Sequence, residues 1–347
     1  MRFIATIASL VLACAAMLAA TLAPSAAEFE KNIMTGGPQG TYIRIGRDLA
    51  GLGAECGQTL NVLESAGSLE NFVGVRNRRN TQFGIVQSDV LEYLKTYEAN
   101  DPEIQKAVHG VRIMFPLYNE EVHLLARKEI ATPKDLDGRK VGVGKADSGT
   151  FLTASLVLDI LRVNKAERVK IGADEALEKL LAGEIDAFFY VAGAPAKLFE
   201  DLRIDPTKFH LVAMNEEPLK ATYTPTRIAA GTYPFMAGDV DLVAVKAVLM
   251  TFDYDKTRNA YHRQSCKAVA DFSSLLISNL DRLKAEGHPK WKSVDLTDLP
   301  PGWQVGVCVK EGMALDYKLD CAGAEPAAKS GEEEYLDLLK KRLNAGQ

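Results

Sequence analysis

The 347-residue chain is long enough for two domains with separate cores, and its ordinary apolar content without internal repeats indicates a globular protein. Its 41 Lys and Arg against 46 Asp and Glu give a net charge of −5. A mildly acidic surface argues against nucleic acid or an anionic lipid surface as the partner.

The first 27 residues have the pattern of a secretory signal. A single Arg2 precedes an apolar run from Phe3 to Ala23, and small residues follow up to Ala27. We expect cleavage near Ala27 and a periplasmic mature chain. Its net charge is then about −6, because 40 Lys and Arg face 46 Asp and Glu. Retention of the segment as a membrane anchor is the alternative.

Four cysteines remain beyond this segment: Cys56, Cys266, Cys308 and Cys321. An even number in an exported chain suggests two disulfides, and three connectivities are open. We favour Cys266–Cys308 with Cys56–Cys321, which would tie the C-terminal tail to the first domain, and free buried cysteines are the alternative. No cysteine pair has the spacing of a metal site, so no metal is expected, and no cofactor is predicted.

Five units along the chain each join a short apolar strand through a small-residue turn to an amphipathic helix. The pairs are 29–37 with 41–53, 59–65 with 69–79, 81–87 with 90–97, 139–144 with 151–163, and 185–191 with 196–202. Strands that alternate with helices predict an α/β fold with largely parallel sheets.

The remaining segments suggest two lobes. Residues 111–118, 121–128 and 220–234 have the pattern of extended chain, whereas 239–252, 257–286 and 331–344 have that of helices. We therefore expect the chain to leave the first lobe near Tyr118 and to return near Tyr223. The predicted lobes are 28–118 with 223–347, which includes the C-terminal helices, and 119–222.

Gly, Ser and Thr residues collect where the predicted strands lead into helices. In open α/β sheets, ligands bind outside the carboxyl ends of strands, and free N–H groups at helix N-termini suit carboxylate or phosphate. Such junctions on two lobes suggest a cleft around a small anionic ligand; good turns and caps would give the same residues. Tyr42, Tyr118, Phe189 and Tyr190 fall beside this cleft. We assign Phe188 to the core and leave Phe189 and Tyr190 open between core and ligand contact.

Nucleotide and enzyme motifs are absent from the sequence. The glycines Gly36, Gly37 and Gly40 lack the Gly-Lys-Ser/Thr end of a phosphate loop, and Gly149 is too far along for a dinucleotide fingerprint. There is no Gly-x-Ser-x-Gly or His-Glu-x-x-His, and His123 in its apolar strand is better explained by packing than by catalysis. We predict a protein that is not an enzyme.

The ordered set of motifs resembles the TAXI-type solute receptors of tripartite ATP-independent periplasmic (TRAP) transporters. The resembling pieces are "TGGPQGTYIRIGRDLA", "ESAGSLENFVGVRN", "FGIVQSDV", "LYNEEVHLLARK", "DLDGRKVGVGKADSGT", "EIDAFFYVAGAPA" and "AAGTYP", and they cover most of residues 30–235. The chain departs from the family pattern at Pro38-Gln39, in "LYNEEV" and at Lys145 and Asp147, which puts the identity of the solute in doubt.

The resemblance implies a type II periplasmic-binding-protein fold, with two lobes of mixed sheet flanked by helices. It implies a receptor that closes on a small carboxylate, such as a glutamate-like amino acid or a dicarboxylate, and delivers it to the membrane subunits of a TRAP permease. The binding residues it suggests are Gly36, Thr41, Tyr42, Ser65, Gly67, Ser68, Gln87, Tyr118, Ser148, Gly149, Thr150, Tyr190 and Gly193. Lys145 or Arg127 would supply charge. The alternatives are a binding protein of an ATP-driven importer and a periplasmic sensor without a transport role.

Overall fold

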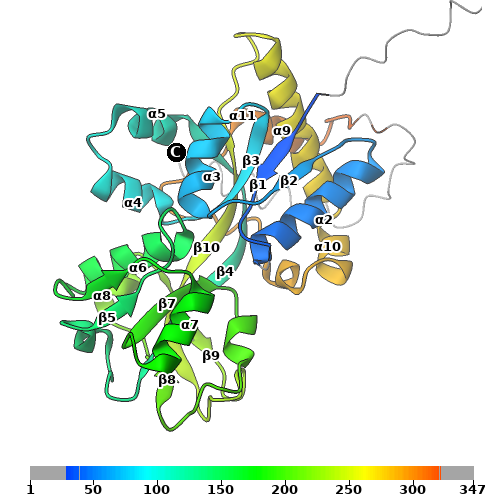
Figure 1. The fold of residues 1–347 in the computed structure, drawn as a ribbon. Coiled ribbons are helices and arrows are strands. Elements are labelled where there is room, and N and C mark those ends of the chain that lie inside the picture. The colour runs from blue at the N-terminus through cyan, green and yellow to red at the C-terminus, as the bar shows by residue number, and fades with distance from the viewer. Residues whose placement is uncertain (1–28, 39, 320, 322–347) are drawn as a thin grey trace, which may run out of the picture.

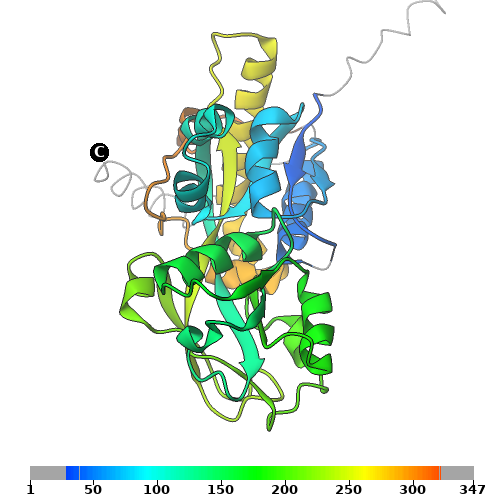
Figure 2. The ribbon, with the colours of Figure 1, turned by 60° about the vertical axis from the view of Figure 1, so that its left-hand side comes forward.

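The computed structural model describes residues 29–38, 40–319 and 321, and these form two lobes (Figure 1). The predicted signal segment and the predicted helix 331–344 lie outside the described residues. Each lobe is a mixed sheet with helices on its faces, so the predicted two-lobed α/β architecture is confirmed. A view turned by 60° shows the two lobes stacked along the long axis of the molecule (Figure 2).

Lobe 1 contains the parallel strands β2, β1 and β3, followed in the sheet by β10 and β4. Its strands are β1 (Asn32–Met34), β2 (Asn61–Leu63) and β3 (Thr81–Gln87). Its helices are α2 (Thr41–Glu55), α3 (Ser68–Asn77), α4 (Val90–Tyr97), α5 (Pro102–Gly110), α9 (Ala260–Ser278), α10 (Leu280–Glu286), the 3-10 helix η4 (Pro289–Ser293) and α11 (Val307–Gly312).

Lobe 2 is built on β5, which pairs in parallel with β6 and β7, while β7 and β8 pair antiparallel with β4. Its strands are β5 (Lys140–Gly142), β6 (Glu167–Val169), β7 (Ala187–Ala192), β8 (Phe209–Leu211) and β9 (Thr224–Ile228). Its helices are α6 (Gly149–Ile160), α7 (Ala173–Ala182), α8 (Glu217–Lys220) and the 3-10 helices η2 (Pro133–Leu136) and η3 (Lys197–Glu200). The helix predicted at 196–202 is thus reduced to one short 3-10 turn.

Two long antiparallel strands connect the lobes, and they join both sheets into one ten-stranded sheet. These are β4 (Val111–Arg127) and β10 (Val240–Phe252). The lobe 1 half of β10 pairs with β3 from Ala247 onward, and its lobe 2 half pairs with β9 up to Ala244. The register between the two strands shifts after Lys246, at the point where they pass between the lobes. The segments 111–118 and 121–128 are therefore one continuous strand.

The prediction of a helix over 239–252 is wrong, because this segment is strand β10. It is flanked by strands on both edges, and most of its residues are buried. A strand covered on both faces has a nearly continuous apolar sequence, which by periodicity alone cannot be told from a buried helix. The frequent valines in this segment are the signal that favours a strand.

The packing also differs from the predicted return near Tyr223. Tyr223, Tyr233 and Leu242 belong to the apolar core of lobe 2, and β9 extends the lobe 2 sheet. Ala247 and Leu249 belong to a lobe 1 core. The chain therefore re-enters lobe 1 within β10, about twenty residues later than the sequence suggested.

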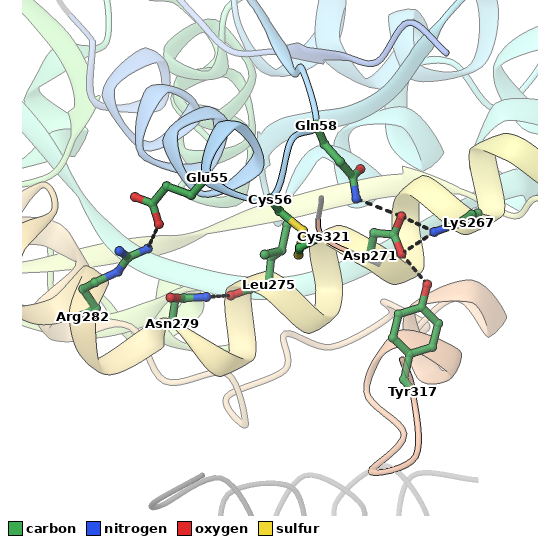
Figure 3. Close-up of a disulfide and its surroundings, with 10 residues drawn as sticks. All are labelled: Glu55, Cys56, Gln58, Lys267, Asp271, Leu275, Asn279, Arg282, Tyr317 and Cys321. Carbon is green, nitrogen blue, oxygen red and sulfur yellow. Dashed lines mark hydrogen bonds and ion pairs between the residues drawn. A yellow bond between two sulfur atoms is a disulfide. The ribbon is translucent and has the colours of Figure 1, made fainter. Parts of the chain in front are cut away.

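Two disulfides lie within lobe 1. Cys266–Cys308 joins α9 to α11, and Cys56 at the end of α2 is bonded to Cys321, as favoured from the sequence. Beside the second bridge, Asp271 accepts hydrogen bonds from Gln58 at 3.0 Å, Lys267 at 2.8 Å and Tyr317 at 2.6 Å (Figure 3). Covalent and polar links thus fasten the C-terminal segment to lobe 1.

Candidate functional site

The lobes meet where the N-termini of α3 and α6 face each other. Gly67, the residue before α3, has φ of +128°, a conformation that glycine adopts without strain. A Cβ atom placed on Gly67 would lie 3.3 Å from the backbone nitrogen of Gly149 in α6. The Leu69 N–H also donates to the carbonyl of Asp147 at 3.2 Å. The two helix ends are therefore in direct contact, with no side chain between Gly67 and Gly149.

The N-terminus of α2 approaches the same place through the loop after β1. Ser65 N–H donates to the Gly36 carbonyl at 3.4 Å, and Gly36 packs against Tyr42. The Ser65 hydroxyl lies 2.6 Å from Asn71 Oδ1 and accepts from the Gly67 N–H at 3.2 Å. Ser65, a predicted ligand contact, therefore holds the loop that carries Gly67 in this structure.

Buried polar side chains from both lobes gather behind these helix ends, and we call them the interlobe cluster. Its members are Tyr42, Ser68, Gln87, Asp89, Tyr118, Glu120, Thr153 and Tyr223, all buried. Three of the eight, Tyr42, Ser68 and Gln87, were predicted as binding residues, and Tyr118 was predicted at the hinge as a fourth. Asp89, Glu120 and Thr153 were not predicted, and Tyr223 was predicted as a boundary.

Glu120 is the carboxyl group at the hinge end of the cluster. The Tyr42 hydroxyl donates to its Oε2 at 2.6 Å, and 4% of the residue is exposed. Burial raises the pKa of Glu120 to about 8, against the opposing effects of the Tyr42 hydrogen bond and the Lys290 charge. Burial and the Glu120 charge also raise the pKa of Tyr42, so its hydroxyl remains a donor.

Asp89 links the two lobes. Its Oδ2 accepts from Thr153 of α6 at 2.8 Å and from Tyr223 at 3.0 Å, while its buried Oδ1 has no hydrogen-bond partner among the described residues. Burial raises the pKa of Asp89 to about 7, against the hydrogen bonds that favour the charged form. An unsatisfied buried carboxyl oxygen is costly, and it marks a place where stability is not maximised.

Ser68, Gln87 and Gly149 are packed tightly together. Ser68 Oγ accepts from the Gln87 N–H at 3.0 Å, and the Thr153 hydroxyl lies 3.2 Å from Gln87 Oε1. A Cβ on Gly149 would lie 2.3 Å from Gln87 Oε1 and 2.8 Å from Ser68 Oγ. A larger residue at the start of α6 would therefore displace the buried side chains of Gln87 and Ser68 while the lobes are in contact.

The hydroxyls of Ser148 and Thr150 are already engaged. Ser148 Oγ caps α6 by accepting from the Phe151 N–H at 3.1 Å and donates to the Lys145 carbonyl at 2.7 Å. Thr150 Oγ1 accepts from the Val191 N–H at 3.2 Å. The groups left for a ligand are the backbone N–H groups of Gly149 and Thr150, which begin the helix and have no acceptor within it.

The remaining predicted residues border the cluster on the lobe 2 side. Tyr190 is half-buried, and its carbonyl lies 3.1 Å from His123 Nδ1. His123 Nε2 lies 2.8 Å from the Tyr233 hydroxyl, and burial lowers the pKa of His123 to about 4. A neutral, bonded His123 matches the packing role inferred for it. Phe188 and Phe189 are both core residues.

The two residues predicted to supply positive charge to the solute, Arg127 and Lys145, are not part of the interlobe cluster. Arg127 pairs with Asp186 at 3.8 Å and donates to the Gly183 carbonyl at the outer end of β4, so it is not part of the interlobe cluster. Lys145 is exposed, and its side chain runs past Gly172. The cation beside the cluster is instead Lys290, whose ammonium lies 5.8 Å from the centre of the Tyr118 ring.

The first-lobe loop is only partly in contact with the cluster. Gly37 is exposed, and the Gly40 N–H donates to its carbonyl at 3.0 Å. Thr41 begins α2 and lies near the Tyr118 hydroxyl, which has no hydrogen bond of good geometry to any residue that the structure describes. Among the described residues, no group of His, Cys, Asp and Glu could hold a metal ion, and no helix is long and apolar enough to cross a membrane.

A match to one protein-family model covers about two thirds of the chain. Residues 33–262 match the model of the NMT1-like family. Solved structures that are similar include the periplasmic binding protein BugD, at 12% identity and a TM-score of 0.46, covering 91% of this chain and 95% of that one. A TctC solute-binding protein from Polaromonas matches at 18% identity and a TM-score of 0.41, covering 75% of this chain and 89% of that one. The GluR0 ligand-binding core from Nostoc punctiforme with L-glutamate matches at 15% identity and 0.40, covering 71% and 97%.

Proposed function

The chain belongs to the NMT1-like family, and from this premise we propose that it is an extracytoplasmic solute receptor. It binds a small carboxylate, a glutamate-like amino acid or a dicarboxylate, between its lobes. It then presents the solute to the membrane subunits of a TRAP permease from the periplasm. The subtype and the permease rest on the motifs that resemble TAXI-type receptors.

One observation carries the proposal: the N-termini of α3 and α6, one from each lobe, face each other over a buried polar cluster. Helix N-termini carry partial positive charge and free N–H groups, and both favour a carboxylate. A solute held by both ends contacts both lobes at once. It therefore stabilises the closed arrangement in proportion to its higher affinity for that arrangement.

The acidic residues of the cluster are compatible with an anionic solute. Because the pKa values of Asp89 and Glu120 are raised to about 7 and about 8, both carboxyls hold protons for much of the time near neutral pH. Protonated carboxyls donate hydrogen bonds and do not repel an anion. Deprotonation in alkaline solution adds negative charge behind the helix ends, so carboxylate binding weakens as the pH rises above about 8.

Thermal unfolding with a panel of solutes tests the solute class. We would add succinate, glutarate, L-aspartate and L-glutamate, with the neutral amino acids as comparison. A solute at a hundred times its Kd stabilises a protein by about 2.7 kcal/mol, a clear rise in Tm. The solute class is wrong if no acid of the panel raises the Tm.

The neighbouring genes test the transport partner. A TRAP permease gene next to the gene for this chain supports delivery to such a permease. An ATPase gene in that place would assign the receptor to an ATP-driven importer and leave the solute class untouched.

A further inference from the structure

Lys290 is carried to the lobe boundary by a firmly anchored turn. It lies on η4, between His288 and Trp291. Asp48 of α2 accepts from the Trp291 indole N–H at 2.7 Å and from the His288 N–H at 2.9 Å, and Trp291 is fully buried. The backbone of this turn is therefore fixed to lobe 1, and the Lys290 side chain extends from it.

The Lys290 side chain reaches lobe 2. A Cβ atom on Gly193, the residue after β7, would lie 2.2 Å from Lys290 Cε, so glycine at this position leaves room for the lysine. The ammonium lies 3.6 Å from Glu121 Oε2 and over the Tyr118 ring. Its charge lowers the pKa of Glu120 against the effect of burial. Lys290 thus touches Tyr118 and Gly193, two residues that the motifs had suggested for the solute.

The ion pair of Lys290 is loose. A separation of 3.6 Å exceeds a normal hydrogen bond, whereas the same Glu121 oxygen accepts from the Ala194 N–H at 2.5 Å. The side chains of Lys290 and Glu121 are 17% and 13% exposed, so water screens the pair little. A lysine ammonium has three donors, and a carboxylate brought between the lobes would be a closer acceptor than Glu121.

We propose that Lys290 is a specificity-determining residue that pairs with a carboxylate of the bound solute. This assignment rests on the proposed function. It makes Lys290, in place of Lys145 or Arg127, the residue that supplies positive charge to the solute. On binding, the ammonium moves from Glu121 to the solute, and Glu121 keeps its bond to Ala194. The rival explanation is that Lys290 and Glu121 are only a structural pair between the lobes.

Isothermal titration of wild type, Lys290→Met and Glu121→Gln with matched acids and amides separates the two explanations. The pairs are L-glutamate with L-glutamine and L-aspartate with L-asparagine, which differ in one charge. Wild type prefers the acid of the bound pair at least tenfold. Lys290→Met keeps the apolar stem of the side chain and loses this preference. Glu121→Gln frees the ammonium and strengthens binding of the acid at least threefold.

Lys292→Met is the matched control, because Lys292 lies on the same turn with its side chain exposed. It removes one positive charge from η4 and keeps the acid preference of wild type. The assignment is overturned if Lys290→Met retains that preference, or if Glu121→Gln weakens binding as much as Lys290→Met does. If neither these two acids nor any other acid of the thermal panel binds wild type, the solute class itself is wrong and the assignment of Lys290 fails with it.

Discussion

The two ends of helix α2 lie in regions that are stabilised in opposite ways. Its last turn leads into Cys56, which is bonded to Cys321 beside the hydrogen-bonded Asp271. Its first turn carries Tyr42, which donates to the buried Glu120 in the interlobe cluster. The first region is cross-linked and its carboxylate is fully paired. The second buries two carboxyls whose pKa values are raised by that burial.

The interlobe cluster contributes less to the stability of the folded protein than the disulfide-linked region does. A buried carboxyl with a raised pKa costs folding free energy at neutral pH, whereas a disulfide adds to it. Proteins depart from favourable burial mainly at functional sites, where a ligand later supplies the missing partners. This contrast supports the proposal that the solute binds at the interlobe cluster and that the disulfide-linked end of α2 stabilises the lobe that carries it.

Removing the disulfide between α9 and α11 is expected to cause the largest change in the free energy of unfolding. Cys266 and Cys308 enclose a loop of sequence separation 42, and its closure in the unfolded chain is worth about 4 kcal/mol. We expect Cys266→Ser with Cys308→Ser to lower the free energy of unfolding by about that amount in urea titrations. Solute affinity at 10 °C should change less than threefold. A large loss of affinity in a folded double variant would contradict the division between support and site.

In contrast to the loss of the disulfide, Asp89→Asn should increase the free energy of unfolding relative to wild type as the pH rises. The native state holds a proton on Asp89 that the unfolded chain releases between its ordinary pKa near 4 and the native pKa of about 7. Wild type therefore loses stability from this group as the pH rises through that window, and the variant does not. Asn still accepts from Thr153 and Tyr223.

The measurement is urea unfolding of both proteins from pH 5 to pH 8. Relative to wild type, we expect Asp89→Asn to gain about 2.7 kcal/mol between these two pH values, because two pKa units are crossed between pH 5 and the native pKa of about 7. Glu120 titrates in both proteins, so its contribution cancels in the difference between their free energies of unfolding. A difference that is constant with pH would show that Asp89 does not carry the raised pKa.

Gly149→Ala tests the contact of the helix ends. The added methyl overlaps Gln87 Oε1 when the lobes are together, and an open arrangement can accommodate it. We expect solute affinity to fall at least tenfold, which corresponds to about 1.4 kcal/mol, as measured by titration calorimetry. Gly138→Ala is an unsuitable control because φ there is +76°. Gly51→Ala adds a methyl to an exposed helical position with nothing within 4 Å and should bind as wild type does.

The smallest effect is expected at the surface of the supporting region. Arg282 pairs with Glu55 at 2.7 Å, but both side chains are well exposed (Figure 3). Such pairs contribute well under 1 kcal/mol because solvent screens them. We expect Arg282→Ala to change the free energy of unfolding by less than about 0.5 kcal/mol. A larger loss would mean that the ion pair orders α10 against α2.

The local elements could be predicted from the sequence where one pattern dominated. Strand β3 and helix α4 have the predicted bounds, and the favoured cysteine pairing is confirmed. Strand β10 could not be predicted by periodicity, because burial on both faces removes the alternation of polar and apolar residues. A helix was expected there for that reason.

Fewer residues of the candidate site than secondary-structure elements could be predicted from the sequence. Turn residues such as Gly67 and Gly149 could be found because close approach of two backbones requires glycine. Lys290 could not be found, since the residues it contacts are about 100 to 170 positions away and no local pattern marks it. Asp89 had the signal of a polar residue between a strand and a helix, but only the fold shows that it is buried.

Small-angle X-ray scattering tests the central claim, that a solute holds the two lobes together through the ends of α3 and α6. It would be recorded for wild type and Gly149→Ala, each with and without the acid that raises the wild-type Tm most. We expect a saturating acid to reduce the radius of gyration of wild type and to leave that of Gly149→Ala unchanged. Equal profiles for wild type with and without bound acid, or the same reduction in Gly149→Ala, would contradict it.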